Sequence, residues 1–241
     1  MLKIITVVVT PFQQNARLIF DPNDGQAVLV DPGGEVERIL AHIPSDVKTV
    51  SRILLTHAHI DHGGGVQAAL VACEERFSEK PKVVAYPEDY GFRASISEQA
   101  RLYGFSPNEY ENVPEPDSFL EDDSTLLIGS FSGRALFTPG HAPDHLSLYF
   151  EETPFRIETF EAGQSRAEVV EGTSPLLLAG DTLFSGSIGR TDLPGGDTAL
   201  LLSSIKEKIF SLPDETRVMP GHGPDTSVGV EKRSNPFMRG A

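Results

Sequence analysis

The sequence is poor in cysteine and in positive charge, and each shortage excludes something. Its one cysteine, Cys73, cannot form an internal disulfide, which fits a reducing compartment. The 20 Lys and Arg residues stand against 35 Asp and Glu residues, so the formal net charge is −15. That charge opposes unspecific binding to nucleic acid or to an anionic membrane. We therefore expect no nucleic-acid partner and no membrane partner.

The sequence also lacks the ~18 or more consecutive apolar residues that a membrane-spanning helix needs. The first run, residues 4–9, has no small-residue cleavage site behind it and does not resemble a secretory signal. We expect a cytoplasmic protein. The 39% of hydrophobic and 23% of charged residues are typical of a globular chain.

The apolar residues that are present alternate between strand and helix patterns. The predicted strands are residues 4–9, 16–20, 27–30, 53–55, 83–86, 125–128, 134–138, 146–150, 176–179 and 216–219. The predicted helices are residues 35–43, 66–77, 95–103 and 197–212, the last with Asp197 or Thr198 as its N-cap. This order predicts two βα halves in one α/β layered domain spanning residues 1–241. Residues 151–174 are rich in Glu, Gly and Ser, which indicates an inserted surface hairpin or loop.

Three of the seven histidines fall within six residues, in the segment His57-Ala58-His59-Ile60-Asp61-His62. Alternate residues of an extended chain point to the same side, so His57 and His59 can bind one ion. Asp61 and His62 can address a second ion only if the backbone turns, and we expect the glycines at 63–65 to allow that turn. Imidazoles with a carboxylate suit Zn²⁺, Fe²⁺ or Mn²⁺.

Further polar residues occur where other apolar strands are predicted to end. They are His141, Asp181 and His222. In layered α/β folds, ligands gather where strands end. Each residue alone is equally well explained as a capping or turn residue. Together with the first segment they predict one metal site.

These motifs match the metallo-β-lactamase superfamily, which the chain resembles over nearly its whole length except residues 151–174. The segment 180–192 and the tail Gly221-His222-Gly223-Pro224, followed by Glu231 and Asn235-Pro236-Phe237, resemble the short glyoxalase II (hydroxyacylglutathione hydrolase) branch. The resemblance implies an αββα four-layer sandwich, in which two sheets are flanked by helices.

The resemblance also implies a dinuclear site that holds two divalent transition-metal ions, Zn first, with Fe or Mn as alternatives. The first metal would be bound by His57, His59 and His141, the second by Asp61, His62 and His222, and Asp181 would bridge them. A metal-bound hydroxide would attack the carbonyl of a small-molecule thioester, S-D-lactoylglutathione or a related acyl-thioester. A thiolate leaves readily, and Asp61 is the one candidate acid in the motif.

Five further residues could support the site. Arg190, Lys232 and Arg233 are candidate contacts for an anionic substrate, and His145 and Asp192 are candidates for holding the metal ligands in place. The alternatives are an Arg190–Asp192 pair that fixes a Gly-rich loop and ordinary solvated charges at 232 and 233.

Asp144 stands where members of the family commonly have Gly. Its carboxylate could hydrogen-bond a ligand imidazole or could face solvent.

The main competing function is a mononuclear-iron persulfide dioxygenase, because such relatives share the segment Gly189-Arg190-Thr191-Asp192. Their last motif typically reads Pro-x-His-Asp-Tyr, whereas residues 220–224 here read Pro-Gly-His-Gly-Pro, which favours the hydrolase. The charge of −15 disfavours nucleic-acid processing. The Asp61 motif and the absence of a signal pattern disfavour a secreted β-lactam hydrolase.

Overall fold

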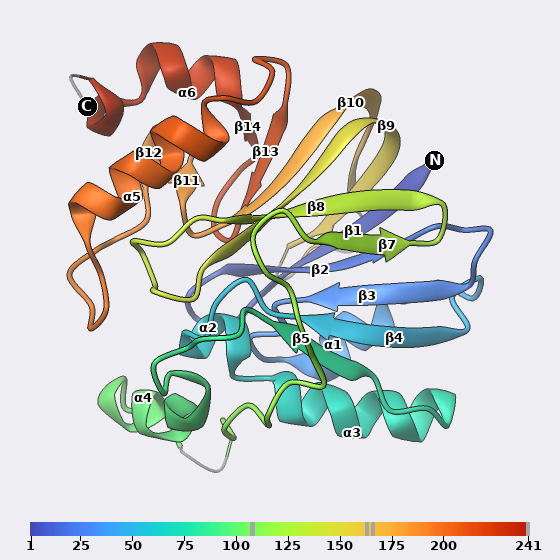
Figure 1. The fold of residues 1–241 in the computed structure, drawn as a ribbon. Helices are drawn as coiled ribbons and strands as arrows, with labels where there is room; N and C mark the ends of the chain where they lie inside the picture. The colour runs from blue at the N-terminus through green and yellow to red at the C-terminus, as the bar shows by residue number, and fades with distance from the viewer. Residues whose placement is uncertain (107–108, 162–163, 165–166, 240–241) are drawn as a thin grey trace.

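The computed structural model describes residues 1–106, 109–161, 164 and 167–239. Two sheets pack face to face, with α1 and α3 outside one of them and α5 and α6 on the opposite side of the molecule (Figure 1). This is the expected four-layer arrangement of helices, two sheets and helices.

The N-terminal half forms the first sheet. Its strands are β1 (Leu2–Val9), β2 (Gln14–Phe20), β3 (Gln26–Val30), β4 (Thr49–Leu54), β5 (Lys82–Ala85) and β6 (Ser118–Phe119). β1 to β3 are antiparallel neighbours, and β3 to β6 run parallel. The connections carry α1 (Val36–Ala41), α2 (Ile60–Gly63), α3 (Val66–Phe77), the 3₁₀ turn η1 (Arg93–Ser95) and α4 (Ile96–Leu102).

The C-terminal half forms the second sheet. Its strands are β7 (Thr125–Ile128), β8 (Phe131–Phe137), β9 (Leu146–Phe160), β10 (Glu168–Gly180), β13 (Arg217–Pro220) and β14 (Thr226–Ser227). The remaining elements are the small hairpin β11 (Leu183–Phe184) and β12 (Ser187–Ile188), α5 (Thr198–Ser204), the π-helical turn η2 (Ile205–Ile209), α6 (Val228–Ser234) and the 3₁₀ turn η3 (Pro236–Met238).

The long hairpin of β9 and β10 joins the two sheets. Near its base β9 pairs with β8, and farther along it pairs in parallel with β1, with Leu2 opposite Phe155. The β9–β10 ladder shifts register between Ser174 and Leu176 at this passage. Residues 151–160 and 168–174, which the composition suggested to be an inserted surface hairpin or loop, are the outer parts of these two strands.

Three apolar clusters fill the spaces between the layers, as alternation along the strands requires. One lies between the first sheet and α1 and α3, and includes Ile53 and Leu70. The second lies between the sheets and includes Ile4 and Phe150. The third lies between the second sheet and α5, and includes Leu201.

The last long helix differs from its prediction. Asp197 is its N-cap, and the carboxylate accepts a hydrogen bond from the Leu200 backbone N–H at 3.0 Å. The helix changes to the wider π turn η2 and ends at Ile209 instead of Leu212. The longest described helix, α3, has 12 residues, and none in the described part of the chain is both long and apolar enough to cross a membrane.

Candidate metal centre

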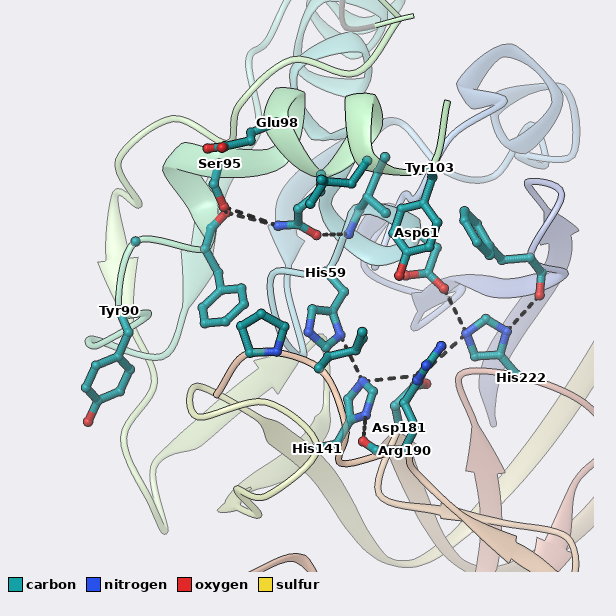
Figure 2. Close-up of a pocket in the computed structure, with 18 of the residues that line it drawn as sticks. His59, Asp61, Tyr90, Ser95, Glu98, Tyr103, His141, Asp181, Arg190 and His222 are labelled. Carbon is teal, nitrogen blue, oxygen red and sulfur yellow. Dashed lines mark hydrogen bonds and ion pairs between the residues drawn. The ribbon is translucent and has the colours of Figure 1, made fainter. Parts of the chain in front are cut away.

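Strand ends and one short helix bring all seven predicted ligand residues to one place. They are His57 and His59 after β4, Asp61 and His62 on α2, His141 after β8, Asp181 after β10, and His222 after β13. The parallel pairing of β10 with β13 places Asp181 and His222 at the same edge of the sheet. Figure 2 shows His59, Asp61, His141, Asp181 and His222 converging.

The first group of side chains is His57, His59 and His141. Nε2 of His141 lies 2.9 Å from Nδ1 of His59 and 3.2 Å from Nε2 of His57. One ligand atom from each residue lies within 4.8 Å of the others, all three being buried. These residues are the set expected to bind the first metal.

The second group is Asp61, His62 and His222, whose ligand atoms also lie within 4.8 Å of one another. Oδ2 of Asp61 is 3.1 Å from Nε2 of His222. Asp181 lies between the two groups, because its Oδ2 is 3.6 Å from Nε2 of His141 and 3.5 Å from Nε2 of His222. The resemblance implied a bridging carboxylate at Asp181, and this residue lies where one could contact both groups.

Several buried polar atoms of the site fit a bound cation. Within the described part of the chain, Nε2 of His59, Nε2 of His62 and Oδ1 of Asp181 are buried without a well-formed hydrogen bond, and the last two stand 3.3 Å apart as an ion pair. Leaving such atoms without partners costs about 1–3 kcal/mol each. Nitrogen and carboxylate donors in this number suit divalent transition metals, so the residues present fit two such ions.

Burial and neighbouring charges set the protonation of these residues. Burial and adjacent imidazoles hold the pKa of His57 well below its usual value and lower the pKa of His59 to about 3. Both are therefore neutral, as a ligand imidazole must be. Burial also opposes the charged forms of His62 and His222, but neighbouring carboxylates, Asp181 among them, raise the pKa of both. A metal ion bound to His62 and His222 would replace the protons that these two imidazoles carry.

Asp31, which the sequence prediction missed, holds His62 in place. Its Oδ2 is 2.9 Å from Nδ1 of His62, and its two oxygens accept hydrogen bonds from the Thr56 N–H and hydroxyl, each at 2.7 Å. Thr56 in turn lies 3.0 Å from Nδ1 of His57. The signal was present, because Asp31 directly follows the apolar strand β3 just as the ligands follow theirs.

The outer ring nitrogens of two more ligands face backbone carbonyls. Nδ1 of His141 donates to the Arg190 carbonyl at 2.7 Å, and Nδ1 of His222 donates to the Phe12 carbonyl at 3.0 Å. Such contacts set the ring orientation and leave Nε2 free for a metal.

His145 contacts Asp181 through the backbone. Its Nε2 accepts a hydrogen bond from the Asp181 N–H at 2.9 Å, and its Nδ1 lies 3.0 Å from the Thr138 hydroxyl. Gly180 allows this approach, because a Cβ at that position would stand 2.4 Å from Nε2 of His145. His145 thus contacts the backbone of one candidate ligand, and its supporting role stays a prediction.

Asp144 takes neither of the two positions considered for it. It is buried instead of facing solvent, its Oδ1 has no hydrogen-bond partner, and the hydrogen bonds of the described residues link it to no ligand imidazole. Burial raises the pKa of this carboxyl to about 7.

The charged candidates lie farther out. Arg190 lines the cavity above the site, and its guanidinium donates to both carboxylate oxygens of Asp192, at 2.7 and 2.9 Å. Lys232 and Arg233 lie on α6 and pair with Asp214, at 2.8 and 3.6 Å. Among the described residues, neither Lys232 nor Arg233 lines the cavity.

A cavity of about 830 Å³ opens above the metal ligands. His59, Asp61, His141, Asp181 and His222 all contribute to its lining. This volume is typical of a site for a small molecule, so a substrate in the cavity would reach the ligand groups directly.

The chain belongs to the metallo-beta-lactamase superfamily, whose family model matches residues 9–155. Its relatives include the probable metallo-hydrolase YqgX of Bacillus subtilis (strain 168), which is 36% identical over 96% of this chain and 95% of its own. The hydroxyacylglutathione hydrolase GloC of Haemophilus influenzae (strain Rd) is 34% identical over 96% of each chain. The protein therefore belongs to the class of metallo-hydrolases.

Solved structures agree with this assignment. The BLEG-1 B3 metallo-beta-lactamase is 34% identical with a TM-score of 0.76, and the comparison covers 100% of both chains. TTHA1623 in a di-iron-bound form is 34% identical with a TM-score of 0.74, over 96% of this chain and 98% of its own. The fold is thus the metallo-beta-lactamase fold, which binds divalent metal ions.

Proposed function

We propose that this protein hydrolyses a small-molecule thioester at a dinuclear metal centre. The observation that carries the proposal is the pair of ligand groups that share Asp181 beneath one cavity. Further support comes from the similarity to GloC, a hydroxyacylglutathione hydrolase. S-D-lactoylglutathione or a related acyl-thioester is the substrate class that we propose.

Two metal ions bound there would lower the pKa of a coordinated water and polarise a carbonyl oxygen. The chain's own residues position the ligand nitrogens and admit the substrate. The ring contacts of His62, His141 and His222 fix the donor nitrogens, and the cavity would admit a thioester to the metal ions that these nitrogens hold. In the net reaction, water adds its oxygen to the acyl carbon while the C–S bond breaks, giving an acid and a thiol.

Asp61 is the residue that we propose to handle the proton. Burial disfavours its charged form, but the hydrogen bond from His222 lowers the pKa of the carboxyl, so Asp61 is ionised. It lines the cavity floor and can accept a proton from the attacking water. A thiolate is a good leaving group, so a separate acid is not required.

Metal counting tests the dinuclear part of the proposal. Purified protein should carry close to two transition-metal ions per chain, with zinc as the proposed metal and iron or manganese as alternatives. His59→Ala should lower metal content and turnover together. His42→Ala is the matched control, since His42 stacks on Phe160 outside the site. One ion per chain, with full activity in Asp61→Ala and His222→Ala, would contradict the dinuclear centre.

A substrate panel tests the reaction. Metal-loaded protein should release thiol from acyl-thioesters, without consuming oxygen when given glutathione persulfide. Oxygen uptake without thioester cleavage would establish the persulfide dioxygenase instead. A chromogenic β-lactam belongs in the same panel because BLEG-1 is a metallo-beta-lactamase. Hydrolysis of the β-lactam alone would replace the thioester proposal.

We further propose that the protein acts in the cytoplasm on a small molecule and not on nucleic acid. The free, buried thiol of Cys73 and the net charge of −15 support this placement.

A further inference from the structure

Apolar side chains from two parts of the chain form two walls of the cavity. The first wall comes from the β1–β2 connection and the α4 region, and includes Phe12, Phe92, Leu102 and Tyr103. The second wall follows β10 and includes Phe184, Ile188, Leu193 and Pro194. Five of the candidate metal ligands line the same cavity, so groups that flank a bond reacting there lie beside apolar surface.

The first wall is exposed but held in position. Leu102 is 81% exposed and Tyr90, at the same rim, is 72% exposed. The ring of Phe12 packs edge-on against Tyr103 at 5.2 Å and against Phe105 at 5.7 Å, which keeps the wall in place without a ligand. Contiguous exposed apolar groups mark a surface that a binding partner covers.

The cavity offers little to a charged substrate. Arg190 is the one Arg or Lys in the described lining, and Asp192 accepts hydrogen bonds from its Nε and Nη2, so one edge of the guanidinium is already paired. Glu98 adds a negative charge to the same lining. Lys232 and Arg233, which could have bound the carboxylates of glutathione, pair with Asp214 outside the cavity.

We infer that the site selects thioesters with an apolar acyl group, aliphatic of medium length or aromatic, and does not require the carboxylates of glutathione. This inference rests on the proposed thioester hydrolysis and, within the substrates proposed there, favours a related acyl-thioester over S-D-lactoylglutathione. Each methylene buried against the walls should raise kcat/KM by ~4-fold, until the chain fills the cavity.

The test uses acyl groups matched on two thiols. Acetyl, D-lactoyl, hexanoyl and phenylacetyl esters of N-acetylcysteamine, which is uncharged, are compared with the same esters of glutathione on zinc-loaded protein. We expect hexanoyl and phenylacetyl esters to exceed D-lactoyl at least tenfold in kcat/KM on either thiol. A preference for D-lactoylglutathione over all others would overturn the inference while leaving thioester hydrolysis standing.

A variant pair locates the selectivity. Leu102→Ser should reduce the hexanoyl-to-lactoyl ratio by roughly threefold or more with unchanged metal content, because a methyl-rich wall becomes polar. Leu127→Ser is the control, since Leu127 is also exposed but lies on β7 outside this cavity. An unchanged ratio in Leu102→Ser would remove this wall from substrate binding.

A binding measurement separates this inference from the proposed reaction. The S-hexyl and S-methyl thioethers of N-acetylcysteamine cannot be hydrolysed, so calorimetry reports the cavity alone. The hexyl compound should bind at least tenfold more tightly to wild type, and Leu102→Ser should narrow the difference. Equal affinities would overturn the apolar site, whereas preferential hexyl binding without any thioester cleavage would defeat the reaction and retain the site.

Discussion

Asp31 and His62 are joined through Oδ2 and Nδ1 at 2.9 Å, in a place that water does not reach. The same carboxylate binds the backbone and hydroxyl of Thr56, which directly precedes His57. One acidic side chain therefore positions parts of both ligand groups. It does so from a left-handed backbone conformation, φ +50°, that a non-glycine residue adopts only where its contacts stabilise it.

Asp31→Asn should weaken metal binding by roughly 10- to 100-fold, the usual effect of losing a carboxylate behind a ligand imidazole. An amide carries no charge to hold the His62 ring and its Nδ1 proton. Competition against a chromogenic chelator measures the affinity. Asp24→Asn, an exposed acidic residue, is the control and should bind metal like wild type. Wild-type affinity in Asp31→Asn would show that packing alone orients the His62 ring.

Gly221 is a second position where a small change should remove metal. A Cβ there would stand 2.1 Å from Oδ1 of Asp181 and 2.7 Å from Cε1 of His62, so Gly221→Ala must displace the site. We expect loss of at least one metal ion per chain, measured by elemental analysis on folded protein.

Gly186→Ala is the matched control for that change. Gly186 has φ +71° and open space around its Cβ direction, so alanine should cost about 1 kcal/mol of backbone strain and leave the metal content unchanged. If Gly221→Ala kept two ions, the backbone would have to shift more easily than these contacts suggest.

The clustered segment of residues 57–62 and the three strand ends followed by His141, Asp181 and His222 could be recognised from the sequence, because each is a local pattern. That the seven converge depends on strand order, which places β4, β8, β10 and β13 so that their ends meet. Asp31 follows β3 in the same way, yet its role is visible only from its contacts with His62 and Thr56.

Two expectations failed to capture the structure for physical reasons. The outer part of β10, residues 168–174, is largely exposed, so its polar composition resembles that of a loop although its backbone is paired with β9. The glycines after His62 were expected to supply backbone freedom. Gly64 has ordinary helical angles, φ −65° and ψ −23°, and its small size matters instead, since a Cβ would stand 2.6 Å from the Tyr110 ring.

The double change Lys232→Ala and Arg233→Ala decides whether the α6 cations contact the substrate. Because both pair with Asp214 and neither lines the cavity, we expect KM for a glutathione thioester to stay within about twofold of wild type. Steady-state kinetics at two salt concentrations would measure this KM. A KM raised several-fold at low salt would restore these residues as substrate contacts.

Asp21 makes the stability of the fold depend on acid, away from the metal site. Its Oδ2 accepts from the Ser130 hydroxyl at 2.7 Å and from the Ser130 N–H at 3.0 Å. The Ser130 hydroxyl is the largest influence that lowers the pKa of this carboxyl from 3.8 to about 2, and burial opposes it. A carboxyl whose pKa is lower in the folded state stabilises the protein above the unfolded pKa, and the contribution disappears as pH falls towards the folded value.

Asp21→Asn should therefore lower the free energy of unfolding at pH 7 by on the order of 1 kcal/mol after solvent screening. The gap between variant and wild type should close as pH falls from about 4 to about 2. Urea denaturation of metal-free protein at several pH values measures it, since removing the metal excludes titration coupled to the site. Ser130→Ala should likewise lower the free energy of unfolding at pH 7, because it removes the hydroxyl that donates to Asp21. Its difference from wild type should shrink over the same fall in pH. A gap that persists unchanged at pH 2 would mean that the Asp21 carboxylate acts through shape alone.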